Sequence, residues 1–501
     1  MKKNKKNKNT KTNKNKFFTI TSYLLIITFI VAIGFLIYFE VLPTLYLSLL
    51  IVGGGLIIFL LFKILNNKRL KKWIKTVLSV PSMLLIILFT MICLYSYGTI
   101  DFLNNIFDVG IRHDSYSVYV LKESEYENIK DLKDKIIGVS EKNDEGTKKA
   151  IEKVSNKIEF NMAEYDTVGD SIDSLEDNEI DAIIALDSNV DILKEDNDKY
   201  DNLKAIYTFT VTTKVKTLSS DKNVAKDNFV VYISGIDTSG KVAAKARSDV
   251  NIIMAVNPKK KKILMINTPR DYYVMLHTKN AMDKLTHAGV YGIEESVGTL
   301  EDLYDIKIDY YARVNFTTFM NIVESLDGIE VDVPVSFCEQ TSSRTSTNQI
   351  CLKKGLQTLN GEQALALSRT RHTLSGGDRS RGENQMLVLN AIINKAISPS
   401  IIVKYNSLLG SVSNSVITNM EQKSFTKLIK NQIRNNTKWE IDSYSVDGSD
   451  ASSTTYSTGR SKAYVMKPDE ETVLEAKKKL DEVLETNKYT TTTTSKVEKN
   501  N

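Results

Sequence analysis

The sequence predicts an α/β protein whose folded region is preceded by three transmembrane helices. Three observations lead to this prediction. Three long apolar runs with few charges follow one another near the N-terminus. The rest of the chain alternates short β-branched runs with helical patterns, which is typical of α/β domains. Finally, 501 residues leave room for two or three domains besides the membrane segments.

Each apolar run is long enough to span a bilayer. The runs are Phe17–Tyr38, Leu42–Leu65 and Val77–Tyr97, and with their short loops they form an anchor over residues 17–98. Residues 1–16 are nearly all Lys, Asn and Thr, a composition that favours a disordered tail. The alternative, apolar helices of a soluble core, requires three unbroken apolar runs in succession.

Basic residues indicate the orientation of this anchor in the cell membrane. They precede the first run and fill the loop at residues 68–75, between the second and third runs. Because basic loops stay in the cytoplasm, we expect a cytoplasmic N-terminus. Three spans then place everything after about Gly98 outside the cytoplasm.

The balance of charges excludes one class of protein. The chain has 66 Lys and Arg against 61 Asp and Glu, and its net charge of +5 is smaller than the contribution of the lysines in residues 1–16. The remainder is mildly acidic, so no nucleic-acid partner is expected. Four histidines without ligand spacing give no signal for zinc.

The three cysteines fall into two groups. Cys93 lies in an apolar run, where it behaves as a small hydrophobic residue. Cys338 and Cys351 lie in a polar region, close enough in sequence to close a short disulfide loop if that region is extracytoplasmic. Two free thiols are the alternative.

A first external module is expected at residues 114–215. Two of its stretches, Asp131–Val139 and Ser174–Ile184, resemble one lobe of a bacterial solute-binding protein. No binding residues carry over, so a structural spacer is the favoured role. Alternating elements indicate a small parallel or mixed α/β domain. Strands are predicted at 117–121, 136–140, 158–165, 180–186 and 205–211, and helices at 145–154 and 171–176.

A second external module is expected at residues 228–488, after a polar linker at 212–227. The Thr- and Lys-rich residues 489–501 are expected to be a disordered tail. Strands are predicted at 229–236, 251–256, 263–267, 306–314, 329–333 and 439–446, and helices at 296–304, 319–325, 362–368, 377–397 and 468–486.

Arginine is concentrated in residues 369–385, although only twelve of the 66 basic residues are arginines. Arginine recognises phosphate or carboxylate in a planar, bidentate way that lysine cannot match. The stretch therefore predicts such a site. A solvated loop with incidental charge does not explain the choice of Arg over Lys. Its charged members include Arg369, Arg371, Asp378, Arg379 and Arg381.

Other charged residues follow or precede predicted strands, where ligands bind in α/β domains. Carboxylates at such an edge can hold Mg²⁺, and arginines there can neutralise phosphate. Together they provide what phosphoryl transfer requires. A network of salt bridges that stabilises the edge is the alternative. These residues are Asp237, Arg247 with Asp249, Arg270 with Asp271, and Lys284 after Asp283.

Several motifs follow one another between about residues 228 and 397. In this order they resemble the LytR–CpsA–Psr family of Gram-positive cell-envelope proteins, and the layout of tail, anchor, accessory domain and external domain is also similar. The motifs are Gly235-Ile-Asp237, Arg247-Ser-Asp249, Thr268-Pro-Arg-Asp271, Asp283-Lys-Leu-Thr-His-Ala288, Asp309-Tyr-Tyr311, Leu326-Asp-Gly-Ile-Glu-Val-Asp332, Leu359-Asn-Gly-Glu-Gln-Ala-Leu365, and Arg369-Thr-Arg371 with Asp378, Arg381 and Gln385.

The resemblance implies an α-β-α sandwich with a central mixed sheet that acts as a phosphotransferase. Its substrates are expected to be a polyprenyl-pyrophosphate-linked glycopolymer, of teichoic acid or capsule type, and peptidoglycan at the lipid bilayer. The polymer moves with one phosphate to a peptidoglycan hydroxyl, and polyprenyl phosphate leaves.

The resemblance also implies roles for individual residues. Asp237 and Asp249 look like ligands of Mg²⁺ or Mn²⁺. Asp378 is the candidate base, and Arg270 and Arg371 join it as catalytic candidates. The expected pyrophosphate contacts are Arg247, Arg270, Arg369, Arg371, Arg381 and Gln385, with Lys284 and Arg379 as additions.

Two positions depart from the family pattern. Asn384 stands where the family often has Arg, so one phosphate contact is missing or comes from Arg379. Thr286 stands where the family often has Asn. Neither change removes the Asp and Arg residues, so an active enzyme is expected.

Two other functions are compatible with these residues. One is a non-catalytic envelope sensor or transcriptional attenuator, in which the first module binds a ligand. The other is a pyrophosphatase that acts on the same lipid-linked substrate with water as acceptor. The acceptor does not alter the phosphate-binding residues, so the sequence leaves transferase and pyrophosphatase open.

Overall fold

The structure is a computed structural model that describes eleven stretches of the chain. Contacts divide the chain into two units, residues 1–105 with 422–436, and residues 106–421 with 437–501. Each unit is described by itself below. The described residues are 2–38, 44–106, 111–196, 198–214, 220–236, 245–342, 349–370, 378–398, 416–435, 437–459 and 461–489.

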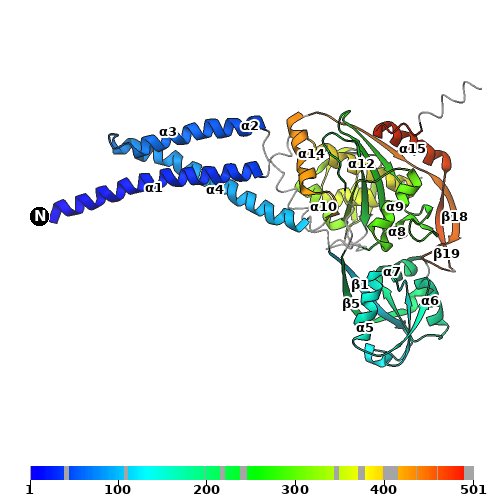
Figure 1. Ribbon diagram of the computed structural model, residues 1–501. Coiled ribbons are helices and arrows are strands. Elements are labelled where there is room, and N and C mark those ends of the chain that lie inside the picture. Colours follow the sequence, from blue (N-terminus) through cyan, green and yellow to red (C-terminus); the bar gives the residue numbers. More distant parts are fainter. Residues whose placement is uncertain are drawn as a thin grey trace, which may run out of the picture. The chain divides into compact units, whose positions relative to one another are not determined.

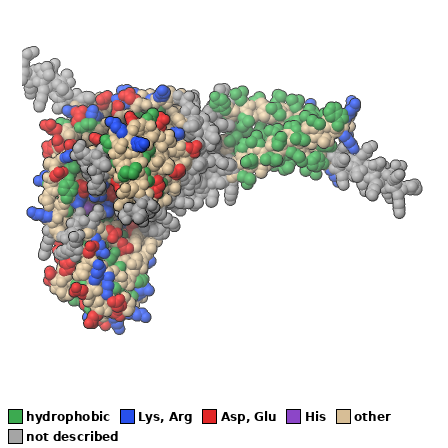
Figure 2. Space-filling view, turned by 180° about the vertical axis from the view of Figure 1, so that it is seen from behind, with side chains coloured by type: hydrophobic (Ala, Val, Ile, Leu, Met, Phe, Trp, Pro, Cys, Tyr) green, Lys and Arg blue, Asp and Glu red, His purple; other side chains and the backbone are tan. Residues whose placement is uncertain are grey.

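The first unit is helical (Figure 1), and hydrophobic side chains cover its long helices (Figure 2). Three stretches are long and apolar enough to cross a membrane, Lys16–Tyr38, Tyr46–Asn66 and Lys72–Leu94. The chain thus carries the three apolar helices that the sequence predicts. The helices are α1 (Lys2–Tyr38), α2 (Thr44–Leu49), the π-helix η1 (Leu50–Gly54), α3 (Gly55–Asn66), α4 (Lys72–Ile106) and α14 (Gln422–Asn435).

Helix α1 begins at Lys2, so residues 2–16 are drawn as helix where the sequence predicts a disordered tail. The lysines of this segment are good helix formers. Extending a helix that the apolar span already forms also avoids the cost of nucleation. Composition alone does not reveal that advantage.

The smaller of two large sheets in the second unit lies in residues 111–214, the accessory module. Its strand order is β3-β2-β4-β1-β5, with β2, β3 and β4 parallel and β1 antiparallel to its neighbours β4 and β5. The elements are β1 (Ile111–Leu121), η2 (Ile129–Leu132), β2 (Ile136–Ser140), α5 (Glu145–Ser155), β3 (Asn161–Tyr165), α6 (Val168–Glu176), β4 (Ala182–Leu186), α7 (Asp187–Asp196), η3 (Asp198–Asn202) and β5 (Leu203–Lys214).

Two accessory helices begin with side chains that satisfy their free amides. Oδ2 of Asp144 accepts a hydrogen bond from the Thr147 amide at 3.1 Å, and Oγ1 of Thr167 accepts one from the Asp170 amide at 3.1 Å. Helices α5 and α6 therefore start directly after the carboxyl ends of β2 and β3.

The larger sheet belongs to residues 220–489, the large domain. Its order is β16-β11-β6-β7-β8-β17, and it mixes parallel pairs (β11 with β6, β8 with β17) and antiparallel pairs. The strands are β6 (Phe229–Ile236), β7 (Val250–Asn257), β8 (Lys262–Asn267), β11 (Tyr310–Asn315), β16 (Val416–Thr418) and β17 (Glu440–Ser445).

Helices cover both faces of this sheet, which makes the large domain the expected α-β-α sandwich (Figure 1). Apolar residues of α9 and α15 form one core with alternate residues of β6, β7 and β8. Helix α12 packs against β7, β8, β17 and α11, and α11 packs against α10. The helices are α8 (Leu285–Tyr291), α9 (Ile293–Tyr304), α10 (Phe316–Ser325), α11 (Gly361–Arg369), α12 (Asp378–Ala396) and α15 (Glu470–Leu484).

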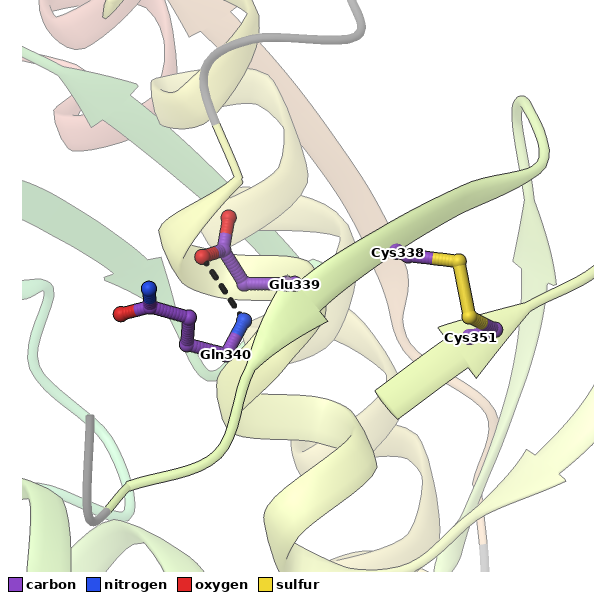
Figure 3. The surroundings of a disulfide bond; sticks show 4 residues. All are labelled: Cys338, Glu339, Gln340 and Cys351. Carbon is purple, nitrogen blue, oxygen red and sulfur yellow. Dashed lines mark hydrogen bonds between the residues drawn. A yellow bond between two sulfur atoms is a disulfide. The ribbon is translucent and has the colours of Figure 1, made fainter. Parts of the chain in front are cut away.

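Four two-stranded sheets complete the large domain, and one carries the disulfide. Cys338 of β13 and Cys351 of β14 lie opposite each other and are joined, with their Cα atoms 4.1 Å apart (Figure 3). The structure thus contains the pairing rather than two free thiols. The strands are β9 (Tyr273–Met275), β10 (Met282–Lys284), β12 (Ile329–Val333), β13 (Phe337–Gln340), β14 (Gln349–Leu352), β15 (Gly355–Leu359), β18 (Gly448–Thr454) and β19 (Lys462–Pro468).

Candidate phosphate-binding site

Charged segments of the large domain start from one edge of its six-stranded sheet. Strands β6 and β8 end at this edge and β7 begins there, because Gly235 pairs with Val250 and Asn267 pairs with Ile252. Strand β17 also ends there, since Ser445 pairs with Asn267. The loops after β6 and β8 and before β7 therefore leave the sheet from neighbouring points.

Asp249 and Arg270 form the central pair of this edge. Nη1 of Arg270 donates to Oδ1 of Asp249 at 2.8 Å, and the hydroxyl of Thr286 donates to the same oxygen at 3.4 Å. The amide of Asp249 donates to the carbonyl of Gly235, and the amide of Thr286 to the carbonyl of Arg270, each at 2.8 Å. Segments from three parts of the chain are thus joined around one carboxylate.

Arginines hold the carboxyl of Asp249 in its ionised form. Burial alone would raise the pKa of Asp249. The positive charges of Arg270, Arg247 and Arg381 outweigh burial, so this pKa is lowered. Burial also lowers the pKa of the Arg247 guanidinium, and the charge of Asp249 opposes that shift. Three arginines therefore lower the pKa of this one carboxyl group.

A second carboxylate connects Arg270 to Lys284. Nε of Arg270 donates to Oδ2 of Asp271 at 3.4 Å, and Nζ of Lys284 lies 3.9 Å from Oδ1 of Asp271. Lys284 and Asp271 are only 5% and 6% exposed. The structure therefore brings Lys284, an additional candidate from the sequence, close to Arg270.

Asp283 fixes the segment that carries Lys284. Its Oδ1 accepts from the Lys284 amide and contacts Nδ1 of His287, both at 2.7 Å. Its Oδ2 accepts from the amide and hydroxyl of Ser457 at 2.9 and 2.6 Å. Burial would raise the pKa of Asp283, but the charge of His287 and these hydrogen bonds lower it. This buried acid is a structural anchor.

Helix α12 brings Arg381 and Gln385 toward the same edge. A Cβ at Gly382 would lie 2.1 Å from Nδ2 of Asn267, so glycine lets α12 come close to the end of β8 without displacing that side chain. Arg381 is 7% exposed. Nε2 of Gln385 donates to the Ser368 carbonyl at 3.3 Å, which ties α12 to α11.

Arg369 ends α11, and its guanidinium carbon lies 5.2 Å from the centre of the Phe316 ring. Such stacking holds a guanidinium in place while its edge stays able to donate. Phe316 begins α10, directly after the end of β11 at the edge described above. Helix α11 thus places Arg369 beside Phe316, near the edge where β11 ends.

Arg379 has a different environment from the one expected. Its Nε donates to the carboxylate of Asp447, its Nη2 donates to the carbonyl of Gly448, and its side chain is 42% exposed. These bonds account for its raised pKa, since the hydrogen bond from Arg379 to Asp447 is the largest cause. The structure therefore gives Arg379 a partner at the start of β18 and does not join it to Asp249.

Three predicted residues are not covered by these contacts. Asp237 and Arg371 lie outside the described residues. Asp378 is the first residue of α12, and only its backbone is described.

Sequence reasoning missed Arg313, which is fully buried in β11. Its Nε donates to Oγ of Ser234 at 3.2 Å, and its Nη2 donates to Oγ of Ser248 at 3.1 Å. Ser248 separates Arg247 from Asp249, so Arg313 supports the segment that carries both. An arginine within the apolar strand Tyr310–Asn315 was the signal that could have revealed it.

Asn384, one of the two departures from the family pattern, is 3% exposed. Its Nδ2 has no hydrogen-bond partner among the residues that the structure describes. A buried amide without a partner costs about 1–3 kcal/mol. This position therefore offers an unused donor inside the domain.

The donor atoms at Asp249 fit a hard divalent cation. Both hydrogen bonds that Asp249 accepts from described residues end on Oδ1. Within the described ranges no group of three or more His, Cys, Asp and Glu side chains could hold a metal. Mg²⁺, however, is often bound by one or two carboxylates together with substrate phosphates and water. The ionised carboxylate of Asp249 can supply one such ligand.

Comparisons with known proteins identify relatives of this region. The LytR_cpsA_psr family matches residues 184–482. The polyisoprenyl-teichoic acid–peptidoglycan teichoic acid transferase TagT of Bacillus subtilis is 38% identical over 202 residues, 40% of this chain and 62% of TagT. The transferase TagV of the same organism is 33% identical over 276 residues, 54% of this chain and 68% of TagV.

The match does not extend over these curated relatives in full, since the chain spans less than two thirds of the length of TagT. Among solved structures, the crystal structure of B. subtilis TagV is 33% identical, covers 52% of this chain and 98% of that chain, and has a TM-score of 0.44.

Proposed function

Because the chain belongs to the LytR–CpsA–Psr family, we propose that it is a membrane-anchored phosphotransferase. It moves a glycopolymer from a polyprenyl-pyrophosphate carrier to peptidoglycan and releases polyprenyl phosphate. TagT and TagV are named teichoic acid transferases, which favours a teichoic acid as the polymer. A capsule-type polymer uses the same pyrophosphate linkage and is the second substrate to test.

One observation carries this proposal: Arg247, Arg270 and Arg381 all act on the single carboxylate of Asp249. The cluster has an excess of positive charge at a sheet edge. A pyrophosphate brings several negative charges and oxygens that arginines can bind in pairs. Such fixed donors stabilise charge that develops during transfer.

In the proposed reaction, a peptidoglycan hydroxyl oxygen attacks the phosphorus that carries the polymer. The bond from that phosphorus to the bridging oxygen breaks, and polyprenyl phosphate leaves with that oxygen. The hydroxyl proton passes to a carboxylate, for which we propose Asp378. Arg270 and Arg371 are proposed to bind the transferring phosphate, because positioning and charge stabilisation provide most of the catalysis in such reactions.

The remaining contacts divide between the two phosphates of the substrate. We propose Arg247, Arg369, Arg381, Lys284 and Gln385 as their donors. Nδ2 of Asn384 supplies a donor at the position where the family often has arginine, in place of Arg379.

Mg²⁺ or Mn²⁺ is the proposed cofactor, held by Asp249 and Asp237. The cation neutralises negative charge on the pyrophosphate. Asp249 also orients Arg270 through their hydrogen bond, so it serves both the cation and the arginine.

The proposed location is the outer side of the cell membrane, with a cytoplasmic N-terminus. Two features support it. The helices α1 to α4 include three apolar stretches long enough to span a bilayer. The large domain carries the disulfide of Cys338 and Cys351, a bond that persists in oxidising surroundings.

The test is a transfer assay with the full chain in detergent. It receives a lipid-pyrophosphate-linked teichoic acid, peptidoglycan oligomers and Mg²⁺, and the products are analysed by mass spectrometry. We expect polymer joined to peptidoglycan through one phosphate, equal amounts of polyprenyl phosphate, and loss of both with EDTA.

Two variants control this assay. Arg270→Ala should abolish the adduct, whereas Arg379→Ala should leave it, because Arg379 pairs with Asp447 instead. Free polymer phosphate without an adduct would replace the transferase with a pyrophosphatase. No turnover of either kind would contradict an enzymatic function.

A further inference from the structure

The accessory sheet has an acidic edge where β2, β3 and β4 end. Strand β1 begins at the same edge and β5 ends there, since Ile111 pairs with Lys214. Glu141 follows β2, Asp144 caps α5, and Asp187 begins α7. In an α/β sheet, ligands bind at this edge, so its occupant decides what the module does.

The large domain occupies this edge. Nζ of Lys245 lies 3.3 Å from Oδ2 of Asp144, and the ammonium of Lys279 donates to Glu141. Lys279 also lies over the rings of Tyr291 and Tyr456, 4.7 and 5.5 Å from their centres. These contacts join the two modules through charges of opposite sign.

The two modules also share apolar packing. Val290 of α8 is fully buried within the core of the accessory module, and α7 packs against α8. A cavity between them, lined by Glu141, Asn189 and Tyr456 among others, has about 10 Å³ of space. That is room for about one water molecule.

The ion pair of Lys245 lies next to the proposed phosphate site. Lys245 is two residues before Arg247, and its side chain is only 4% exposed. The amide of Ala246 donates to the Gly289 carbonyl at 3.2 Å, and the amide of Ser248 to the Thr286 carbonyl at 3.0 Å. The segment is therefore held by the accessory module at Lys245 and by the large domain beyond it.

We propose that Asp144 of the accessory module positions Arg247 through its ion pair with the buried Lys245, which makes the accessory module a fixed part of the phosphate site. This inference rests on the proposed role of Arg247 in binding pyrophosphate. Asp144 is a positioning residue, because it acts through Lys245. The module is then neither an independent sensor nor a passive spacer.

The charges around Arg247 agree with this arrangement. Asp191 of α7 contributes to the electrostatic surroundings of Arg247, and the charge of Arg247 in turn acts to lower the pKa of Asp191. Burial and the neighbouring Asp187 raise the pKa of Asp191 more strongly, so its net shift is upward. A carboxylate of the accessory module thus contributes to the electrostatic surroundings of the arginine that Lys245 helps to hold.

The test measures binding of inorganic pyrophosphate to the full chain in detergent by isothermal titration calorimetry. Asp144→Asn removes the charge while asparagine still caps α5. Lys245→Met keeps most of the aliphatic stem and also removes the charge. Each variant should weaken binding about tenfold, as loss of a residue that orients a ligand does, and the double variant should be no worse than either single variant.

Glu141→Gln is the matched control. It removes the negative charge that pairs with Lys279 at the same edge. Glu141 does not lie in a segment that carries a phosphate arginine. The variant should lower the melting temperature as much as Asp144→Asn and leave the dissociation constant within about twofold. Asp144→Glu, which keeps the charge, should recover part of the affinity.

The outcomes separate this inference from the proposed function. Wild-type affinity in Asp144→Asn, with binding lost in Arg247→Ala, would overturn the positioning role and leave the phosphate site intact. A double variant whose loss of affinity equals the product of the two single losses would also overturn it. Two residues that act as one pair are expected to give non-additive changes in binding free energy. Absence of pyrophosphate binding in the wild type would overturn both.

Discussion

The two sheets of the second unit use the same kind of edge in opposite ways. In both, charged residues gather where the carboxyl ends of parallel strands lie. At the accessory edge, acids such as Glu141 and Asp144 are paired with lysines of the large domain. At the edge of the large domain, Arg247, Arg270 and Arg381 lower the pKa of Asp249, and Arg270 also donates to Asp271.

The difference shows how to distinguish a structural edge from a binding edge. Charges that are neutralised by another part of the protein stabilise the fold. In a partly buried site, a surplus of negative charge raises the pKa of its acids, and a surplus of positive charge lowers the pKa of its bases. Binding of a group of opposite charge removes the shift. We therefore propose that the edge of the large domain, where arginines gather around Asp249, binds the polyanion, whereas the paired acids of the accessory edge are structural.

The largest expected effect comes from neutralising one acid at the binding edge. Asp249→Asn should lower kcat/KM for transfer about 10³-fold, because Arg270 loses one of its two carboxylate partners and the proposed cation loses a ligand. Glu141→Gln, the same change at the accessory edge, should leave kcat/KM within about twofold. Equal losses in the two variants, measured in the mass-spectrometric assay, would remove the distinction between the edges.

A smaller effect tests whether the surplus charge must be arginine. Arg381→Lys keeps the charge but loses the forked donors. The loss of one hydrogen bond to a charged group is worth about 1.5–3 kcal/mol, so KM for the lipid-linked substrate should rise at least about tenfold. Unchanged KM would mean that Arg381 contributes only charge.

The pKa of Asp249 predicts how stability depends on pH. A carboxyl whose folded pKa lies below its unfolded value stabilises the fold above about pH 3.9, and this contribution is lost as pH falls through the folded pKa. The gap in unfolding free energy between wild type and Asp249→Asn should stay constant above about pH 5 and shrink below about pH 4. Urea denaturation across this range measures it, and a gap that widens in acid would contradict the lowered pKa.

The smallest effect is expected at Arg379, which the sequence alone would assign to the phosphate cluster. Its pair with Asp447 is largely exposed, and exposed pairs contribute about 0–1 kcal/mol. Arg379→Ala should change the free energy of unfolding by less than about 1 kcal/mol and kcat/KM by less than about twofold. A loss of a hundredfold would return Arg379 to the binding edge.

Local patterns were sufficient to predict much of the fold. Ile136–Ser140, Phe229–Ile236 and Ile329–Val333 are strands at the predicted residues. Helix α7 was missed because only Val190, Ile192 and Leu193 are apolar within it and it follows a buried strand without a break. Strand β18 was missed because its residues, Gly448–Thr454, are nearly all small and polar.

The candidate site was only partly predictable, because some of its contacts join residues that lie far apart in the sequence. Asp249, Arg270 and Lys284 lie within the sequence motifs, and the strand register brings their segments together. The pairing of Arg379 with Asp447 depends on the unpredicted strand β18. The link from Asp144 to Lys245 joins residues 101 positions apart, and neither side chain lies in a motif. No local pattern encodes such a contact.

The most direct test of the central claim is a structure of the full chain with a polyprenyl-pyrophosphate-linked sugar and Mg²⁺. The account predicts phosphate oxygens within about 3 Å of the guanidinium groups of Arg247, Arg270 and Arg381, with Asp144 and Lys245 still paired. A pyrophosphate bound elsewhere, or bound at this edge without contact to those three arginines, would contradict it.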